Sequence, residues 1–273
     1  METISVKKYI VSAYSVHKNK ILFVLKILIA GGLLTYIATS IKIPELIRAF
    51  NKADYFLISI AFVLVIPNIL LQYWKWKLTC KSILGYDDRR TILFSLLQGF
   101  SAGAFTPFRV GEYFGRAFQF KEKTLLEVTI ATLIDKFFPL FIVASIGSLS
   151  SIIFIYFFYN VSAFLAAALF VVVFAVFYLL IQLLIDPEFW DNFLFNKIKK
   201  SKVLNKYFSR FRVLKNLDRT YSLKMFLLSF LFYLCFVTQF VVLVSAFTNQ
   251  FNLIDYFWSV FLIIFAKTFF PAI

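Results

Sequence analysis

The sequence predicts an all-α polytopic membrane protein with about six spanning helices and one re-entrant helical hairpin. The first reason is composition: of 273 residues, 61% are hydrophobic, 21% are aromatic and 16% are charged, and the mean hydropathy is +0.83. A soluble domain carries about 25% charged residues, so a soluble fold of this chain would expose large apolar patches. The second reason is that the apolar residues form runs of about 20, which is the length of a membrane-spanning helix.

The composition also excludes several kinds of chemistry. There is one histidine, His17, and the two cysteines, Cys80 and Cys235, lie far apart in the sequence. We therefore expect no metal site and no disulfide framework. Glycine-rich nucleotide-binding motifs are absent, so we expect no cofactor. The net charge of +15 could indicate nucleic acid, but the longest basic tract lies between two apolar runs, which favours anionic lipid as the partner.

Six apolar segments are long enough to cross a bilayer, and they define a single transmembrane domain over residues 1–273. They cover residues 21–40, 55–73, about 128–158, 163–185, 225–248, and a last stretch that starts near residue 256. The first segment is longer than the apolar core of a signal peptide, and no A-x-A cleavage pattern follows it. We therefore expect it to be a retained helix.

The distribution of Lys and Arg predicts the orientation of these spans. The N-terminal segment and the connections 74–90 and 186–224 are basic, whereas 159–162 carries no charge. We expect a multi-pass protein of the cell membrane with a cytoplasmic N-terminus and cytoplasmic loops at 74–90 and 186–224. Interfacial aromatic residues flank these loops, namely Tyr73, Trp74, Trp76 and Trp190. The basic stretch 197–219 either binds the anionic leaflet or serves only to set the topology.

Segment 91–120 must return to the side from which it enters, because 128–158 and 163–185 already supply the two crossings between the cytoplasmic loops. A second full span is excluded, since 107–120 is short and contains three charged residues. We predict a re-entrant hairpin that enters from the cytoplasm, with limbs 91–105 and 107–120. Impermeant reagents should then label positions 88 and 122 from the same side.

The hairpin has an unusual composition. Four of the eight glycines lie here, and small residues at four-residue spacing allow helices to approach closely: Gly99, Gly103, Gly111 and Gly115. Thr106 and Pro107 form a favourable helix start, with Thr at the N-cap and Pro at the first helical position. The second limb would then direct its positive helix N-terminus into the protein, where anions bind.

Charged residues follow this helix start. Arg109, Glu112 and Arg116 are spaced to share one helix face, and Asp135 and Lys136 lie in the next span. Charges within a membrane are costly, which favours a functional site. We expect both arginines to contact a lipid phosphate, with Glu112 orienting them and Asp135 completing the network. The alternatives are a self-neutralising interfacial helix, a Lys136 that extends to the membrane surface and an Asp135 satisfied locally.

These residues resemble a known family. The segment GFSAGAFTPFRVGEYFGR, residues 99–116, is similar to the Thr-Pro-x-x-x-Gly-Glu-x-x-x-Arg signature of the flippase-like membrane family, which includes the transmembrane region of lysylphosphatidylglycerol synthases. The resemblance implies lipid translocation: in the synthases this region moves an aminoacylated phospholipid between leaflets, and archaeal relatives are associated with polyprenyl-linked glycans. It places the headgroup site at Thr106, Pro107, Arg109, Gly111, Glu112, Arg116, Asp135 and Lys136.

The resemblance also implies an internal repeat with a second hairpin. The last residues, AKTFFPAI at 266–273, are similar to AGAFTPFR at 102–109, and the chain stops there. We therefore expect a C-terminally truncated sequence that lacks the second hairpin. The 273 residues contain no soluble aminoacyl-transferase domain, so synthase activity is not expected of them.

Two classes of function lead, and a purely structural membrane partner is a third possibility. The first is a lipid translocase or lipid-binding transporter for an anionic or aminoacylated phospholipid or a polyprenyl-phosphate-linked lipid. The second is an integral-membrane lipid-modifying enzyme, or an accessory subunit of one, that uses Glu112 or Asp135 as an acid or base. The absence of a dense cluster of His, Asp and Glu favours transport. The expected partners are membrane lipids, with a second copy or a transferase as further partners.

Overall fold

The computed structural model describes residues 31, 32, 35, 42–185, 219–248, 250 and 252–269, and these residues form helices and no strand. The chain divides into two compact units, Met1–Ala53 and Asp54–Ile273. The first unit contains α2 (Ile43–Lys52), an amphipathic helix with Pro44 in its first turn and no buried residue. All the other described helices belong to the second unit.

The second unit begins with one long helical run. It consists of α3 (Tyr55–Val63), α4 (Val65–Thr79) and the π-helical turn η1 (Cys80–Leu84). The α-helix is interrupted at Leu64 because Pro67 lacks the N–H group that would otherwise bond to the Val63 carbonyl. A side chain of α12 (Arg219–Thr248) covers the backbone near this break, since Gln239 Nε2 donates to the Ala61 carbonyl at 3.1 Å.

A helical hairpin follows this run. Gly85 ends η1 in a left-handed conformation (φ +66°), and Asp88 caps the next helix by accepting the Thr91 N–H at 2.9 Å. The hairpin consists of α5 (Arg89–Ala104), a 3₁₀ turn η2 (Pro107–Arg109) and α6 (Gly111–Ala117). The predicted limb 91–105 coincides with α5, whereas in the predicted limb 107–120 only residues 111–117 form an α-helix.

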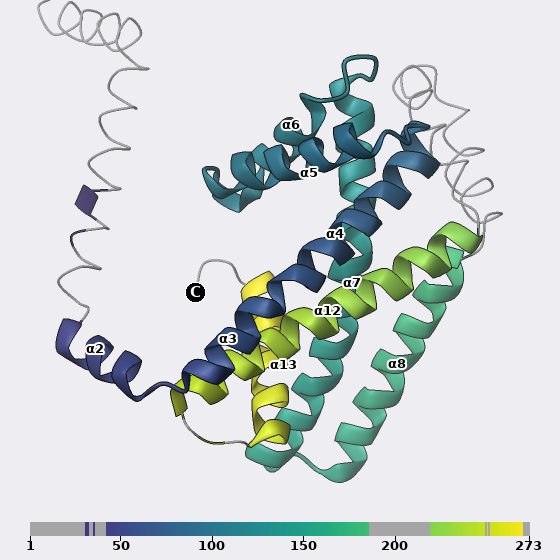
Figure 1. Ribbon diagram of the computed structural model, residues 1–273. Helices are drawn as coiled ribbons and strands as arrows, with labels where there is room; N and C mark the ends of the chain where they lie inside the picture. The colour runs from purple at the N-terminus through teal and green to yellow at the C-terminus, as the bar shows by residue number, and fades with distance from the viewer. Residues whose placement is uncertain are drawn as a thin grey trace, which may run out of the picture. The chain divides into compact units, whose positions relative to one another are not determined.

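Four long helices complete the unit: α7 (Leu125–Phe158), α8 (Ala163–Ile185), α12, and α13 (Leu253–Phe269). A capping box starts α7, in which the Thr124 and Glu127 side chains each bond to the other's backbone N–H. Figure 1 shows α12 beside α3 and α4, with α7 and α13 crossing it and α8 packed against α7. The residues of α8 whose side chains are described are all at least partly exposed, as expected for a helix that faces lipid.

The core has two parts. One lies between α4, η1, α5, α7 and the start of α12 around Trp76, Ile92, Leu96 and Val128, and the other lies between α7, α12 and α13 around Val237. In the second part Gly147 permits close packing of α7 on α13, because a Cβ atom at this position would collide with the Phe265 side chain. The hairpin contacts the first part and is absent from the second.

Four described helices are long and apolar enough to cross a membrane: Tyr55–Leu84, Leu125–Phe158, Ala163–Gln182 and Arg219–Thr248. They coincide with four of the six predicted spans, and α13 coincides with the last. Residues 21–40, apart from Gly31, Gly32 and Thr35, and the terminal segment 270–273 lie outside the described residues. The count of six spans and the internal repeat stay predictions.

Two predicted loop boundaries are wrong. The first transmembrane run continues to Leu84, so Lys75 and Trp76 are buried helical residues rather than parts of a cytoplasmic loop 74–90. Likewise α12 begins at Arg219, inside the predicted loop 186–224, and Tyr221 is buried. In both cases the count of basic residues predicts a loop, whereas the helix continues through those residues. Residues 186–218, including Trp190, lie outside the described residues.

Candidate lipid-headgroup site

The two limbs of the hairpin approach each other closely through glycines. A Cβ atom at Gly111 would collide with the Ala102 carbonyl oxygen, and one at Gly115 would lie 2.5 Å from the Gln98 carbonyl oxygen. Atoms cannot pack at these distances, so only glycine permits this spacing between α5 and α6. The glycine pattern in the sequence therefore has a packing role, which brings the polar residues of α6 against α5.

Thr106 organises the tip of the hairpin. Its Oγ1 donates to the Ala102 carbonyl at 3.1 Å and accepts the Gly111 N–H at 2.7 Å. Pro107 begins a 3₁₀ turn rather than the predicted α-helix, and Phe108 and Arg109 both adopt left-handed backbone conformations (φ +54° and +56°). Non-glycine residues seldom occupy this region, so the tip stores backbone strain.

The predicted geometry of the second limb is therefore wrong in one respect. The α-helix begins at Gly111 and has seven residues, and the N–H of Gly111 is already bonded to Thr106. A free helix N-terminus aimed into the protein is thus not the basis of the site. Arg109 lies before α6, yet its Nε is still 3.5 Å from Glu112 Oε2. The charged side chains of the hairpin and of its neighbouring helices remain the candidates for the site.

Glu112 lies at the centre of a network that we name the hairpin charge cluster: Lys75, Arg109, Glu112, Arg116, Asp135 and Lys136. Glu112 Oε1 accepts from Arg116 Nη2 at 2.7 Å, and its Oε2 accepts from Lys136 Nζ at 2.7 Å. Only about 1% of the Glu112 side chain is exposed. Its carboxylate is thus shared by three cations, counting Arg109.

Asp135 is the second carboxylate of the cluster. It accepts from Arg116 Nη1 at 2.9 Å, and its other oxygen is 3.6 Å from Lys75 Nζ. Lys75 also donates to the Asp135 backbone carbonyl at 3.3 Å. The expectation that Asp135 meets an arginine of the hairpin is confirmed. The cluster joins α4, α6 and α7 at one point.

Trp76 fixes Arg116 from the side of α4. The guanidinium carbon lies 4.2 Å from the centre of the indole ring, a cation–π contact. The indole Nε1 donates to Ser95 Oγ at 3.2 Å, and Ser95 Oγ donates to the Arg116 carbonyl at 3.0 Å. Arg116 is therefore held by two carboxylates and an aromatic ring, and its side chain is buried.

The sequence interpretation missed Lys75 and Trp76. One signal could have found Lys75: Leu71, Lys75 and Thr79 are spaced four residues apart, so they share a helix face, and all three are buried. A lysine on an apolar face requires a partner, which here is Asp135. The basic residues that follow Lys75 instead make the segment 74–90 resemble a cytoplasmic loop.

The cluster contains more positive than negative charge. Its buried or partly buried members are three cations, Lys75, Arg116 and Lys136, against two carboxylates, and Arg109 adds a fourth cation. The Arg109 side chain is 60% exposed and that of Lys136 is 34% exposed, whereas Arg116 is 3% exposed. An excess of positive charge with two accessible members can bind an anion. Within the described residues no group of His, Cys, Asp and Glu is arranged to hold a metal ion.

Comparison with known proteins places the chain in a family. The family model described as the lysylphosphatidylglycerol synthase TM region matches residues 23–273. The chain belongs to this family. No curated protein and no solved structure matches the chain significantly. The family match and the apolar helices show a multi-pass membrane protein, and they confirm the resemblance inferred from the segment 99–116.

Proposed function

We propose that this member of the lysylphosphatidylglycerol synthase TM family is a lipid translocase whose hairpin charge cluster binds the phosphate of a lipid headgroup. The observation that carries the proposal is the cationic excess of the cluster together with the exposure of Arg109 and Lys136. The substrate class is an anionic or aminoacylated phospholipid or a polyprenyl-phosphate-linked lipid. The acyl or prenyl chains stay in the bilayer while the headgroup enters the protein.

The residues of the cluster have different roles in this proposal. Arg109 and Lys136 bind the phosphate. Within the described residues Arg109 pairs with Glu112 through Nε, so its terminal nitrogens remain for a bidentate grip on phosphate oxygens. Arg116 and Lys75 are positioning residues, because both are buried and engaged by carboxylates. Glu112 holds the accessible cations in place until the phosphate arrives.

The strained tip supports a role in binding. Arg109 is held in a left-handed conformation next to Thr106 and Pro107, which fix the turn. Strain of this kind concentrates at ligand sites, where it presets the geometry of a side chain. The competing hypothesis of a lipid-modifying enzyme requires a carboxylate that exchanges protons. Both carboxylates of the cluster are instead engaged by cations, which favours binding.

Reconstitution into liposomes tests the proposal. The full chain is inserted into vesicles that contain phosphatidylglycerol with a fluorescent acyl chain, and dithionite quenches the label that reaches the outer leaflet. Arg109→Lys keeps the charge but loses the bidentate geometry, so we expect exchange to slow by about tenfold or more. Arg90→Lys is the matched control, because Arg90 is exposed and outside the cluster.

Two outcomes would contradict the proposal. Wild-type exchange by both Arg109→Lys and Glu112→Gln would remove the cluster from the transport path. A new lipid product with no exchange between leaflets would support the enzyme hypothesis instead.

A further inference from the structure

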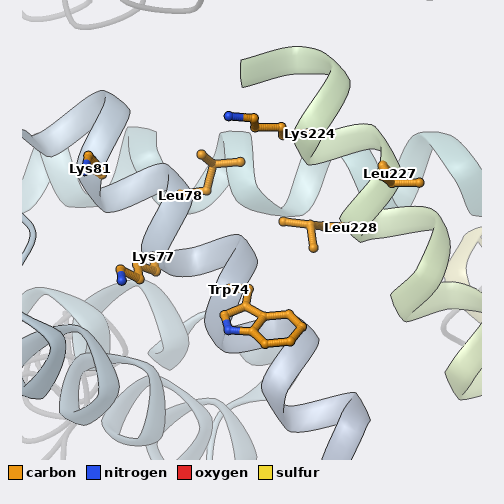
Figure 2. Close-up of a pocket in the computed structure, with 7 residues that line it drawn as sticks. All are labelled: Trp74, Lys77, Leu78, Lys81, Lys224, Leu227 and Leu228. Carbon is orange, nitrogen blue, oxygen red and sulfur yellow. The ribbon is translucent and has the colours of Figure 1, made fainter. Parts of the chain in front are cut away.

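A second group of basic residues lies on the opposite face of α4 and belongs to no site described above. Residues of α4, η1 and α12 form a groove of about 400 Å³ that is lined by Trp74, Lys77, Leu78, Lys81, Lys224, Leu227 and Leu228. Figure 2 shows Lys224 extending from α12 toward the α4 and η1 side, with Trp74 and Leu228 on the apolar part of the wall. We name it the lysine groove.

The charges of the lysine groove all have one sign. Lys77 and Lys81 are one helical turn apart on α4 and η1, Lys224 belongs to α12, and none of the described residues that line the groove is a carboxylate. Asp87, outside the lining, pairs with Lys81 at 2.9 Å, but both side chains are more than half exposed. Exposed pairs contribute little, so the three lysines leave an excess of positive charge beside the groove, which favours an anion as the occupant.

The remainder of the groove is apolar. Trp74 and Leu227 are about half exposed, although each lies beside other apolar side chains of the groove. The lysines lie near the end of the Tyr55–Leu84 span and near the start of the Arg219–Thr248 span. Since these are ends of two membrane-spanning helices, cations and an apolar wall meet at the depth where phospholipid headgroups join their acyl chains.

We propose that the lysine groove binds an anionic phospholipid, with its phosphate on Lys77 and Lys224 and an acyl chain along Trp74, Leu227 and Leu228. Basic pockets between transmembrane helices are suited to such headgroups. A peptide from the neighbouring connection would be a poor occupant, because residues 197–215 are themselves strongly basic. A zwitterionic lipid would add a positive group among the lysines.

This site is distinct from the hairpin charge cluster. Successive residues on an α-helix are about 100° apart, so Lys75 and Lys77 point to roughly opposite sides of α4. Lys75 is buried against Asp135, whereas Lys77 faces the groove. Lipid retention at the groove is an equilibrium property, and it does not depend on whether the cluster translocates lipid.

Native mass spectrometry of the full chain tests this inference. The protein is purified in detergent with an equimolar mixture of phosphatidylglycerol and phosphatidylcholine, and the retained lipids are counted. We expect wild-type protein to retain phosphatidylglycerol preferentially. Lys77→Gln with Lys224→Gln should lower that preference by about thirtyfold, since each basic residue near a membrane surface contributes about a factor of five.

A matched control keeps the total charge equal. Lys121→Gln with Lys123→Gln removes two lysines that lie after the hairpin and outside the groove, and it should leave the preference unchanged. Equal retention of the two lipids by the wild type, or an unchanged preference in the groove variant, would overturn the proposal. So would an equal loss in the control variant, which would mean that general surface charge attracts the lipid.

Fluorescence gives a second readout that reports position. Phosphatidylglycerol with brominated acyl chains should quench wild-type emission more strongly than brominated phosphatidylcholine does. Trp74→Phe should remove most of this difference, because Trp74 lines the groove. Quenching that is the same for both lipids, or a difference that survives in Trp74→Phe, would place the anionic lipid elsewhere.

Discussion

Lys75 and Lys77 are two residues apart on α4, and they occupy opposite electrostatic environments. Lys75 is 4% exposed and lies next to Asp135 of α7, whereas Lys77 lines a groove with Lys81 and Lys224. On one face the carboxylate of Asp135, which is distant in the sequence but adjacent in space, compensates the charge of Lys75. On the other face no described lining residue does so, and we propose that an anionic lipid takes that role. The comparison indicates that a charge paired within the protein stabilises the fold, whereas a charge without such a partner remains available to a ligand.

The largest expected effect comes from removing Glu112, the central carboxylate of the hairpin charge cluster. Glu112→Gln leaves Arg116 and Lys136 without their shared carboxylate in a buried site. We expect a loss of about 3–5 kcal/mol in the free energy of unfolding. Thermal unfolding in detergent measures it. The double variant Glu112→Gln with Arg116→Gln should be more stable than either single variant, because both members of the ion pair are removed together. A double variant less stable than both single variants would contradict this pairing.

The next effect depends on the position of the hairpin, which brings Glu112 to α7. Gly115→Ala places a methyl group against the Gln98 backbone, so the limbs must separate. Overpacking of this kind costs about 1–3 kcal/mol. Gly103→Ala is the control, because its methyl group would meet the Glu112 Cβ at 3.3 Å and needs a smaller shift. Equal unfolding temperatures for the two variants would show that close packing of the limbs is not required.

The lysine pair itself tests the comparison directly. Lys75→Met removes one partner of Asp135, which keeps Arg116, so we expect a loss of about 1–3 kcal/mol. Lys77→Met should change stability by less than about 0.5 kcal/mol, because the side chain has no carboxylate partner among the lining residues. Both are measured by thermal unfolding without added lipid. A larger loss for Lys77→Met would reverse the assignment of the two faces.

The smallest expected effect concerns Asp87, which pairs with Lys81 at the edge of the lysine groove. The hydrogen bond from Lys81 holds the pKa of Asp87 below its ordinary value of 3.8. The ion pair is therefore complete above that value and is lost only as the pH falls through the lower pKa of the folded protein. At neutral pH, Asp87→Asn should free Lys81 and raise retention of phosphatidylglycerol by less than about fivefold. A decrease measured by native mass spectrometry would contradict this expectation.

Several features of the fold follow from local sequence. The uncharged turn 159–162 separates two apolar runs, and the structure places α7 and α8 on either side of it. Thr106 and Pro107 mark the turn of the hairpin, and the four-residue spacing of the glycines indicates close limbs. Glu112 and Arg116 are one helical turn apart, so their ion pair is also local. Such features are predictable because they depend on neighbours in the chain.

Other features were not predictable from the sequence. The burial of Lys75 depends on Asp135, which is far away in the chain, and the position of Arg116 depends on Trp76. The conformation of Arg109 also differs from expectation, since the tip adopts a 3₁₀ turn in place of a continuous helix. A count of basic residues assigns charges to loops because it carries no information about partners in three dimensions.

The sequence by itself determined the membrane class, the hairpin, the segment 99–116 that identifies the family, and the residues that carry charge within the apolar spans. Tertiary structure alone decided which of those charges neutralise one another and which remain available. It brought Lys75 to Asp135, and it placed Lys224 of α12 beside the same groove as Lys77 and Lys81. The physical reason is that hydrophobic periodicity acts over a few residues, whereas charge compensation acts between helices whose packing the local pattern does not specify.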